Sequence, residues 1–246
     1  MTSRPQDLSD GALDEEFAEA WAVAQTVPGW LKVGQARMLF DAVVALPNGS
    51  TVLEIGSHQG RSTVVLGRAL RSRSGSLVCV DPFVDGRLFG GASTRAKFER
   101  NVDDAGIGGV VTLEAEFSTR LRPRWSRGFD LLYVDGKHDY WTFTDDLRWS
   151  AFLPRGGRIL VHDAFSSIGV TLGVLAKVLP SSTLRYLDRS DSMALFAKEA
   201  PGTADRARIL RQMPWWVRNV GIKVLLRLRL RRAAAAVGHD SPYDPY

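Results

Sequence analysis

The sequence predicts an α/β protein with an open, doubly wound sheet that is mostly parallel and ends in an antiparallel β-hairpin. Two observations predict this fold. Short apolar runs alternate with helical stretches between residues 51 and 161, and two further apolar runs flank the polar residues 188–191. Alternation at this pitch is typical of parallel βαβ units, whereas two strands joined by a short turn must run antiparallel.

The individual elements follow from apolar spacing and from turn formers. Helices are expected at 14–25 and 33–46, because Pro28-Gly29 and Pro47-Asn48-Gly49 interrupt their apolar pattern. The remaining expected elements are parallel strands at 51–55, 77–80, 110–113, 129–134 and 158–161, helices at 62–70, 94–105 and 140–152, and a hairpin of 183–187 with 193–197.

The chain divides by composition into three segments. Residues 1–48 are expected to form helices that pack on a central domain at 49–200, and residues 201–246 form a basic C-terminal segment with a short tail. Nine Arg and Lys and no acid lie from Arg206 to Arg232; since the whole chain carries +5, the remainder carries the difference, −4. A nucleic-acid enzyme more often has cations around its active cleft, so we expect no nucleic-acid partner.

Cysteine content and hydropathy restrict the cellular setting. Cys79 is the single cysteine and lies in an apolar run, which excludes an internal disulfide framework and a cysteine-rich zinc site. The N-terminus has no apolar signal-peptide stretch, and no segment reaches the ~18 consecutive apolar residues of a membrane span. We therefore expect a cytoplasmic protein without stable membrane insertion.

Polar side chains follow the predicted parallel strands at the points where the strands end. In open α/β sheets, ligands bind beyond these carboxyl ends, so the residues there are the candidate site. They are Glu54, Gly56, Ser57 and Gly60 after the first strand, Asp81 after the second, Phe117 and Ser118 after the third, Asp135 and His138 after the fourth, and His162 and Asp163 after the fifth.

The turn after the first strand indicates the class of cofactor. Dinucleotide sites use Gly-x-Gly-x-x-Gly to seat a pyrophosphate on a helix N-terminus, but here the spacing is Gly56-x-x-x-Gly60 and Glu54 precedes it. A carboxylate repels a pyrophosphate and attracts an ammonium group. S-adenosylmethionine (SAM) has an ammonium, a sulfonium and no phosphate. Asp81 would accept hydrogen bonds from its ribose hydroxyls. The alternative is a tight strand-to-helix turn without a ligand.

Residues 51–63, Thr-Val-Leu-Glu-Ile-Gly-Ser-His-Gln-Gly-Arg-Ser-Thr, resemble the first motif of class I SAM-dependent methyltransferases, which have a Rossmann-like fold. The closer resemblance, over roughly residues 29–198, is to the branch with catechol and macrolide-sugar O-methyltransferases. It implies that residues 49–200 are a SAM-binding catalytic domain. It also implies that Glu54, Gly56, Ser57 and Ser62 hold the methionine portion of SAM, and that Phe117 and Ser118 lie by the adenine.

This chain departs from the catechol type at the ribose. There the ribose-binding acid stands at the position of Cys79. Residues two apart on a strand face the same way, so Asp81 is expected to replace that acid.

The motifs at 129–140 and 157–163 resemble the paired metal motifs of the same branch. The resemblance implies that Asp135 and Asp163 bind Mg²⁺ or another divalent cation, that Asp135 also borders the cofactor, and that His138 is the general base. His162 is a weaker candidate ligand, because imidazole suits Mg²⁺ poorly. A hard cation lowers the pKa of an alcohol, and histidine titrates in the range needed to accept its proton. The alternatives are a helix cap for Asp135 and a surface position for His138.

The sequence predicts transfer of a methyl group to a hydroxyl of a small molecule, with a sugar or other saccharide as the expected acceptor. Tryptophans near the proposed site suit a carbohydrate, although core packing is their commoner use. Two alternatives differ in class: a metal-independent SAM enzyme with a nitrogen or nucleic-acid acceptor, and a non-catalytic nucleotide-binding module. The tetrapeptide that base-methylating enzymes carry after the fourth strand is absent; Asp135-Gly136-Lys137-His138 stands there.

The basic segment at 214–232 has an ambiguous pattern. Val217, Val220, Val224 and Leu228 share a helical stripe, whereas residues 226–231 alternate with period two, as a strand would. Three uses compete: packing on the catalytic domain or a second subunit, binding of anionic lipid, and capture of an acidic acceptor. Packing, with a homo-oligomer as one outcome, is favoured because the apolar residues need cover. On that basis the protein is not expected to sediment with anionic vesicles.

Overall fold

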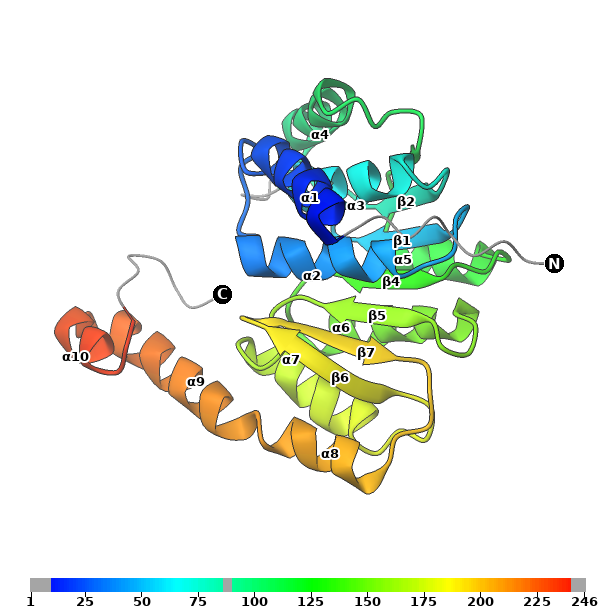
Figure 1. Cartoon of the computed structure of the whole chain (residues 1–246). Coiled ribbons are helices and arrows are strands. Elements are labelled where there is room, and N and C mark those ends of the chain that lie inside the picture. The colour runs from blue at the N-terminus through cyan, green and yellow to red at the C-terminus, as the bar shows by residue number, and fades with distance from the viewer. Residues whose placement is uncertain (1–9, 86–89, 240–246) are drawn as a thin grey trace.

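The structure, a computed structural model, describes residues 10–85 and 90–239; the short tail proposed at the C-terminus lies largely outside them. Their strands form one seven-stranded sheet in the order β3-β2-β1-β4-β5-β7-β6 (Figure 1). Five neighbouring strands are parallel, and β7 runs antiparallel to both β5 and β6. The predicted fold class is confirmed. The strands are β1 Thr51–Ile55, β2 Ser76–Val80, β3 Val111–Glu114, β4 Leu131–Val134, β5 Arg158–Val161, β6 Arg185–Ser190 and β7 Met193–Ala197.

Alternating side chains of the central strands enter two separate cores, one on each face of the sheet. In β1, Val52 packs with the first core, and Leu53 and Ile55 pack with the second. This period of two explains why these strands read as continuous apolar runs: both of their faces are covered.

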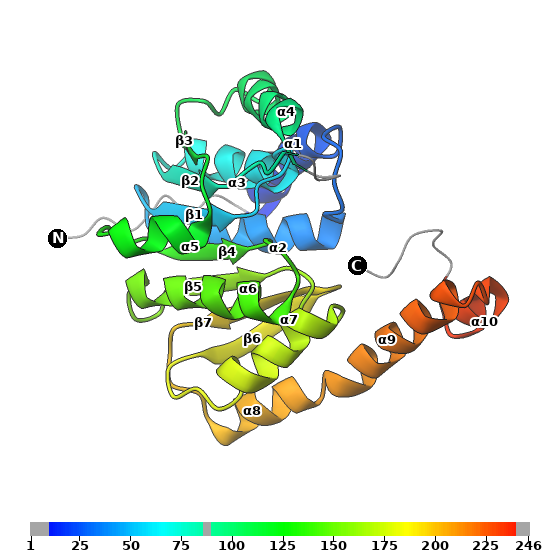
Figure 2. The same ribbon diagram turned by 180° about the vertical axis from the view of Figure 1, so that it is seen from behind.

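Helices cover both faces, as a doubly wound sheet requires (Figures 1 and 2). The first face is covered by α1 Asp10–Ala24, α2 Val33–Val44, α3 Arg61–Arg71 and α4 Ala92–Asp104. The second is covered by α5 Ser118–Leu121, α6 Tyr140–Asp146 and α7 Ile168–Gly173, with a 3₁₀ segment, Leu147–Phe152, after α6 and a π-helical turn, Val174–Val178, after α7. The N-terminal helices therefore pack against α3, and their buried side chains share the first core with the sheet.

The C-terminal segment is helical: α8 Thr203–Leu210, α9 Met213–Arg227 and α10 Arg231–Ala236. Of the two conformations that the sequence left open for 226–231, the strand is wrong. Leu226 and Arg227 complete α9, and Arg231 begins α10. Helix α8 packs on β6, and α9 then leaves the domain as an arm with α10 at its end (Figures 1 and 2). Within the described ranges, every helix is too short or too polar to cross a lipid bilayer.

Candidate active site

Glu54, the last residue but one of β1, lies beneath the turn that follows that strand. Its side chain is fully buried and accepts hydrogen bonds from Ser62 Oγ at 2.5 Å and Thr63 Oγ1 at 2.6 Å, both from the first turn of α3. The Cys79 thiol on β2 adds a third contact at 3.3 Å. Burial raises the pKa of Glu54, and the two hydroxyls oppose that shift. Glu54 thus ties the start of α3 to the sheet, and Ser57 is buried within the same turn.

Two glycines of this turn have left-handed backbone, Gly56 with φ +90° and Gly60 with φ +91°. Gly56 also passes so close to β4 that a Cβ atom there would overlap the carbonyl oxygen of Asp135. Because Gly56 has no side chain, the turn after β1 can lie directly against the residues that follow β4.

Replacement of Gly56 by alanine is therefore expected to destabilise the protein by several kcal/mol, because it combines a left-handed residue with a backbone overlap. Gly49 is a matched control: its φ is +80°, and nothing lies within 4 Å of the position that a Cβ atom would take. Gly49→Ala should cost only the conformational term, about 1 kcal/mol. Urea unfolding of both variants measures the difference, and equal losses would show that the close approach is unimportant.

Asp81 follows β2 and joins two loops. Its Oδ2 accepts the backbone N–H of His58 at 2.9 Å, and its Oδ1 accepts that of Phe83 at 2.8 Å. Both of these residues have positive φ. The His58 ring lies 5.6 Å from the ring of Trp30, which is half exposed. Asp81 therefore links the turn after β1 to the loop after β2.

The end of β3 brings Ser118 to a second buried carboxylate. Phe117 is 43% exposed, whereas Ser118 is buried and donates its hydroxyl to Asp146 Oδ1 at 2.5 Å. Asp146, the last residue of α6, also lies against Gly136, where a Cβ would come within 3.0 Å of Oδ2. Burial raises the pKa of Asp146 to about 7. Asp146 is not among the residues predicted from sequence, because an acid at the end of a helical stretch has no distinguishing local signal.

Asp146→Asn should flatten the pH dependence of stability. The folded protein holds the Asp146 proton to about pH 7, and the ordinary pKa is 3.8. The associated stability is therefore present below about pH 4 and lost as the pH rises to 7. Between pH 5 and pH 8 the wild type should lose about 2 kcal/mol more than the variant in urea unfolding. Asp188→Asn, which alters an exposed acid of β6, is the control and should keep the wild-type slope.

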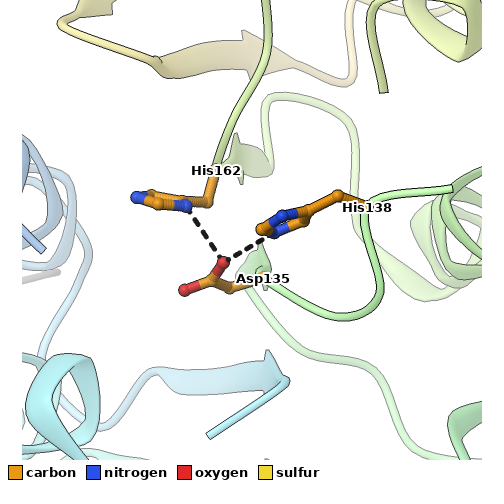
Figure 3. Close-up of side chains that lie close together, drawn as sticks. All are labelled: Asp135, His138 and His162. Carbon is orange, nitrogen blue, oxygen red and sulfur yellow. Dashed lines mark hydrogen bonds and ion pairs between the residues drawn. The ribbon is translucent and has the colours of Figure 1, made fainter. Parts of the chain in front are cut away.

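Asp135, His138 and His162 converge after β4 and β5 (Figure 3). Asp135 Oδ1 lies 3.3 Å from His138 Nε2 and 3.1 Å from His162 Nδ1, and its Oδ2 accepts the Tyr133 hydroxyl at 2.9 Å. Burial alone would raise the pKa of Asp135, but the two imidazoles beside it hold that pKa well below its usual range. One carboxylate and two imidazoles within 4.8 Å of one another could hold a metal ion.

Asp163 belongs to the same cluster. Its side chain is fully buried, and its Oδ2 lies 3.0 Å from His138 Nδ1. His138 thus bridges the two carboxylates. Burial would lower the pKa of His138, but hydrogen bonds with Asp135 and Asp163 raise it to about 10. His162 Nε2 is buried without a hydrogen-bond partner among the residues that the structure describes.

The loop after β5 that presents Asp163 is tightly held. Asp163 and Phe165 both have left-handed backbone, with φ of +57° and +60°. The Asp163 carbonyl accepts the N–H groups of Ser166 and Ser167, and Asn219 of α9 donates to the Phe165 carbonyl at 3.3 Å. The arm therefore contacts the loop that carries the site. This contact could not be predicted from sequence, because nothing local relates residue 219 to residue 165.

Comparisons with known proteins agree with this architecture. Residues 53–164 match the family model described as a methyltransferase domain. A putative O-methyltransferase from Klebsiella pneumoniae is similar at 19% identity and a TM-score of 0.57, covering 79% of this chain and 93% of its own. An S-adenosylhomocysteine (SAH)-bound methyltransferase from Podospora anserina is similar at 16% identity and a TM-score of 0.57, and the alignment covers 80% of this chain and 100% of that one. A putative rRNA methylase from Clostridium thermocellum is similar at 14% identity and a TM-score of 0.53, and the alignment covers 70% of this chain and 100% of that one.

The matched residues 53–164 span the end of β1, the Asp135 cluster and Asp163. The chain has the fold of class I methyltransferases, and residues 53–164 match a methyltransferase domain. Sequence identities below 20% to these structures show that the fold is shared, and they do not identify the methyl acceptor.

Proposed function

We propose that the protein transfers the methyl group of SAM to a hydroxyl of a saccharide, with a divalent cation at Asp135 and His138 as the general base. The single observation that carries this proposal is the cluster in which His138 bridges the carboxylates of Asp135 and Asp163, at 3.3 and 3.0 Å. It lies at the carboxyl ends of β4 and β5 in a methyltransferase fold, where ligands of open α/β sheets bind.

The residues around the β1 turn fit SAM by their charge. Glu54 and Asp81 lie at this end of the sheet, and the nearby cation Arg61 is held by the carbonyl of Gly29 at 2.7 Å. Acids at this edge of the sheet suit an ammonium and a sulfonium better than a phosphate. SAM supplies an activated methyl group. We assign Gly56, Gly60 and Ser62 to the methionine portion, Asp81 to the ribose, and Phe117 and Ser118 to the adenine, with Glu54 holding Ser62 from beneath.

The cluster also fits a cation. Two carboxylates that converge on one protonated imidazole form a site that stabilises positive charge. Asp135 and Asp163 would hold the ion, and His162, whose Nδ1 lies 3.1 Å from Asp135 Oδ1, would offer a further ligand atom. If His162 takes part, the donor set favours a transition metal such as Mn²⁺ over Mg²⁺. A bound divalent cation lowers the pKa of a hydroxyl and orients it.

His138 can then serve as the base through a defined atom. Its Nδ1 faces the buried Asp163 and its Nε2 faces Asp135, and the two carboxylates favour the protonated imidazole. A cation held by Asp135 and Asp163 would offset their charge and lower the pKa of His138, so that Nε2 would accept a proton while Nδ1 keeps its own. The acceptor hydroxyl would give its proton to Nε2 while its oxygen takes the methyl group, and the sulfur of the methyl donor would leave as the neutral thioether. Trp141, 79% exposed in the first turn of α6 and three residues after His138, offers a flat apolar surface for a sugar ring.

The decisive experiment measures methyl transfer from SAM to a panel of saccharides, before and after chelation with EDTA. We expect turnover that chelation removes and that Mg²⁺ or Mn²⁺ restores. Turnover that EDTA leaves unchanged would support a metal-independent enzyme on another acceptor. SAM binding without turnover on any hydroxyl, amine or nucleic-acid acceptor would support a non-catalytic module.

Asp81→Asn should raise the Kd for SAM about tenfold, since the change removes one charge-assisted hydrogen bond worth ~1.4 kcal/mol. Titration calorimetry measures it. Asp85→Asn is the control: this exposed acid accepts from the backbone of Ala92 at 3.3 Å. Equal SAM affinity in the wild type and in Asp81→Asn would place the ribose elsewhere.

A further inference from the structure

The outer face of the arm α9 is apolar along its centre. Val217, Val224 and Leu228 are 62%, 51% and 63% exposed, and Gly221 lies between them with nothing within 4 Å of a Cβ position. These residues recur at spacings of four, three and four, so they share one side of the helix. The opposite side is the one that packs, because Asn219 and Ile222 are buried. The stripe of residues 217, 221, 224 and 228 thus faces away from the domain.

Cations border this stripe and continue beyond it. On α9, Arg218 and Arg227 lie on either side of the stripe, and both are exposed. Arg229, Arg231 and Arg232 follow at the end of the arm, and they and Arg227 make no ion pair with an acid within residues 10–85 and 90–239. An apolar stripe with arginines at its margins suits a surface that is apolar inside and anionic at its edge, because arginine stems extend along the apolar region toward the charge.

The arm borders the active site. Asn219 contacts the loop after β5, which presents Asp163. Three other exposed apolar side chains lie at the same edge of the sheet: Trp141 in the first turn of α6, and Ile168 and Leu172 on one side of α7. Helices α6 and α7 pack against each other. The exposed apolar residues of the site and of the arm therefore belong to neighbouring elements.

We infer that the arm docks the enzyme on an anionic lipid surface, so that the active site works beside the membrane. The inference concerns location and adds to the proposed function. It reverses the expectation from sequence, which favoured packing when the conformation of 226–231 was open. Once the segment is a helix that leaves the domain, its stripe has no cover in the described part of the chain.

A second copy of the chain fits this face less well. A twofold contact between two arms would bring Arg218 and Arg227 of one copy to the same residues of the other, and like charges repel at close range. The acids of α1, such as Asp14, Glu15 and Glu19, could attract the arm, but the residues exposed among them include no large apolar side chain to cover the stripe.

The test is flotation of the full-length protein with vesicles of phosphatidylcholine alone or with a quarter phosphatidylglycerol. We expect the bound fraction to rise at least tenfold with the anionic lipid, and to fall at least tenfold when NaCl is raised from about 0.1 to 0.5 M. Val217→Ser/Val224→Ser/Leu228→Ser should remove binding. Val33→Ser/Leu210→Ser alters two side chains that are equally exposed but lie off the arm, and it should bind as the wild type does.

Arg227→Gln/Arg231→Gln/Arg232→Gln provides a second variant in case the serine variant fails to fold, and circular dichroism with SAH binding checks the fold of each. This variant should lower binding at least tenfold. No binding to anionic vesicles, or equal binding to both lipids, would overturn the inference. A stable dimer by light scattering that dissociates in the serine variant would assign the stripe to a second copy instead. Because flotation needs neither acceptor nor turnover, failure of the proposed chemistry would leave this result unaffected.

Discussion

Replacement of Asp135 by alanine is expected to remove cation-dependent turnover, with a loss of 10³-fold or more in kcat. The expectation rests on its position: one oxygen of Asp135 faces both His138 and His162, and the other accepts from Tyr133. Electrostatic stabilisation by a bound cation is worth several kcal/mol, which corresponds to losses of this size. SAM affinity should change by only a few fold, since Asp135 is at most one of several contacts to the cofactor.

Steady-state kinetics across a range of Mg²⁺ and Mn²⁺ concentrations, with calorimetry for SAM, separates the two effects. Asp145→Ala is the matched control, because this acid pairs with Arg122 and Arg148 and is outside the cluster. The control should keep its metal dependence. If Asp135→Ala retained wild-type turnover in EDTA, the cation would have no part in the reaction.

His138→Ala should lower kcat by roughly 10² to 10⁴, the usual contribution of a general base, and leave acceptor affinity little changed. The substitution leaves the carboxylates of Asp135 and Asp163 without the imidazole that bridges them. Added imidazole should restore part of the rate, which a purely structural loss would not allow.

His239→Ala is the control for the loss of an imidazole, because this residue lies at the end of the arm, after α10. It should turn over at the wild-type rate. An unchanged kcat in His138→Ala would remove His138 from the mechanism, and a loss of rate that imidazole does not rescue would assign it a positioning role.

The sheet could be predicted from sequence because its signal is local. Buried parallel strands read as short apolar runs, and the predicted run 51–55 coincides with β1. The first strand of the hairpin is less regular, since β6 is partly exposed and has a register shift between Tyr186 and Asp188. Helices α5 and α7 were not predicted, because segments of four and six residues are too short to show a helical period.

The candidate site was only partly predictable. Strand ends place Asp135, His138, His162 and Asp163 near one another, because parallel strands end at one edge of the sheet. Which of them pair depends on side-chain directions that the sequence does not encode locally. Glu54 illustrates this limit: it was expected to face the cofactor, and its oxygens instead accept from Ser62 and Thr63 beneath the turn.

The turn after β5 has a consequence for protein engineering. Left-handed backbone at Asp163 and at the buried Phe165 costs on the order of 1 to 3 kcal/mol at each residue, and it persists because Ser166, Ser167 and Asn219 hold their carbonyls. A selection for thermal tolerance alone would reward changes that relax this turn, and would thereby move the buried carboxylate away from His138. In this enzyme, resistance to heat and catalytic competence are expected to compete at the same few residues.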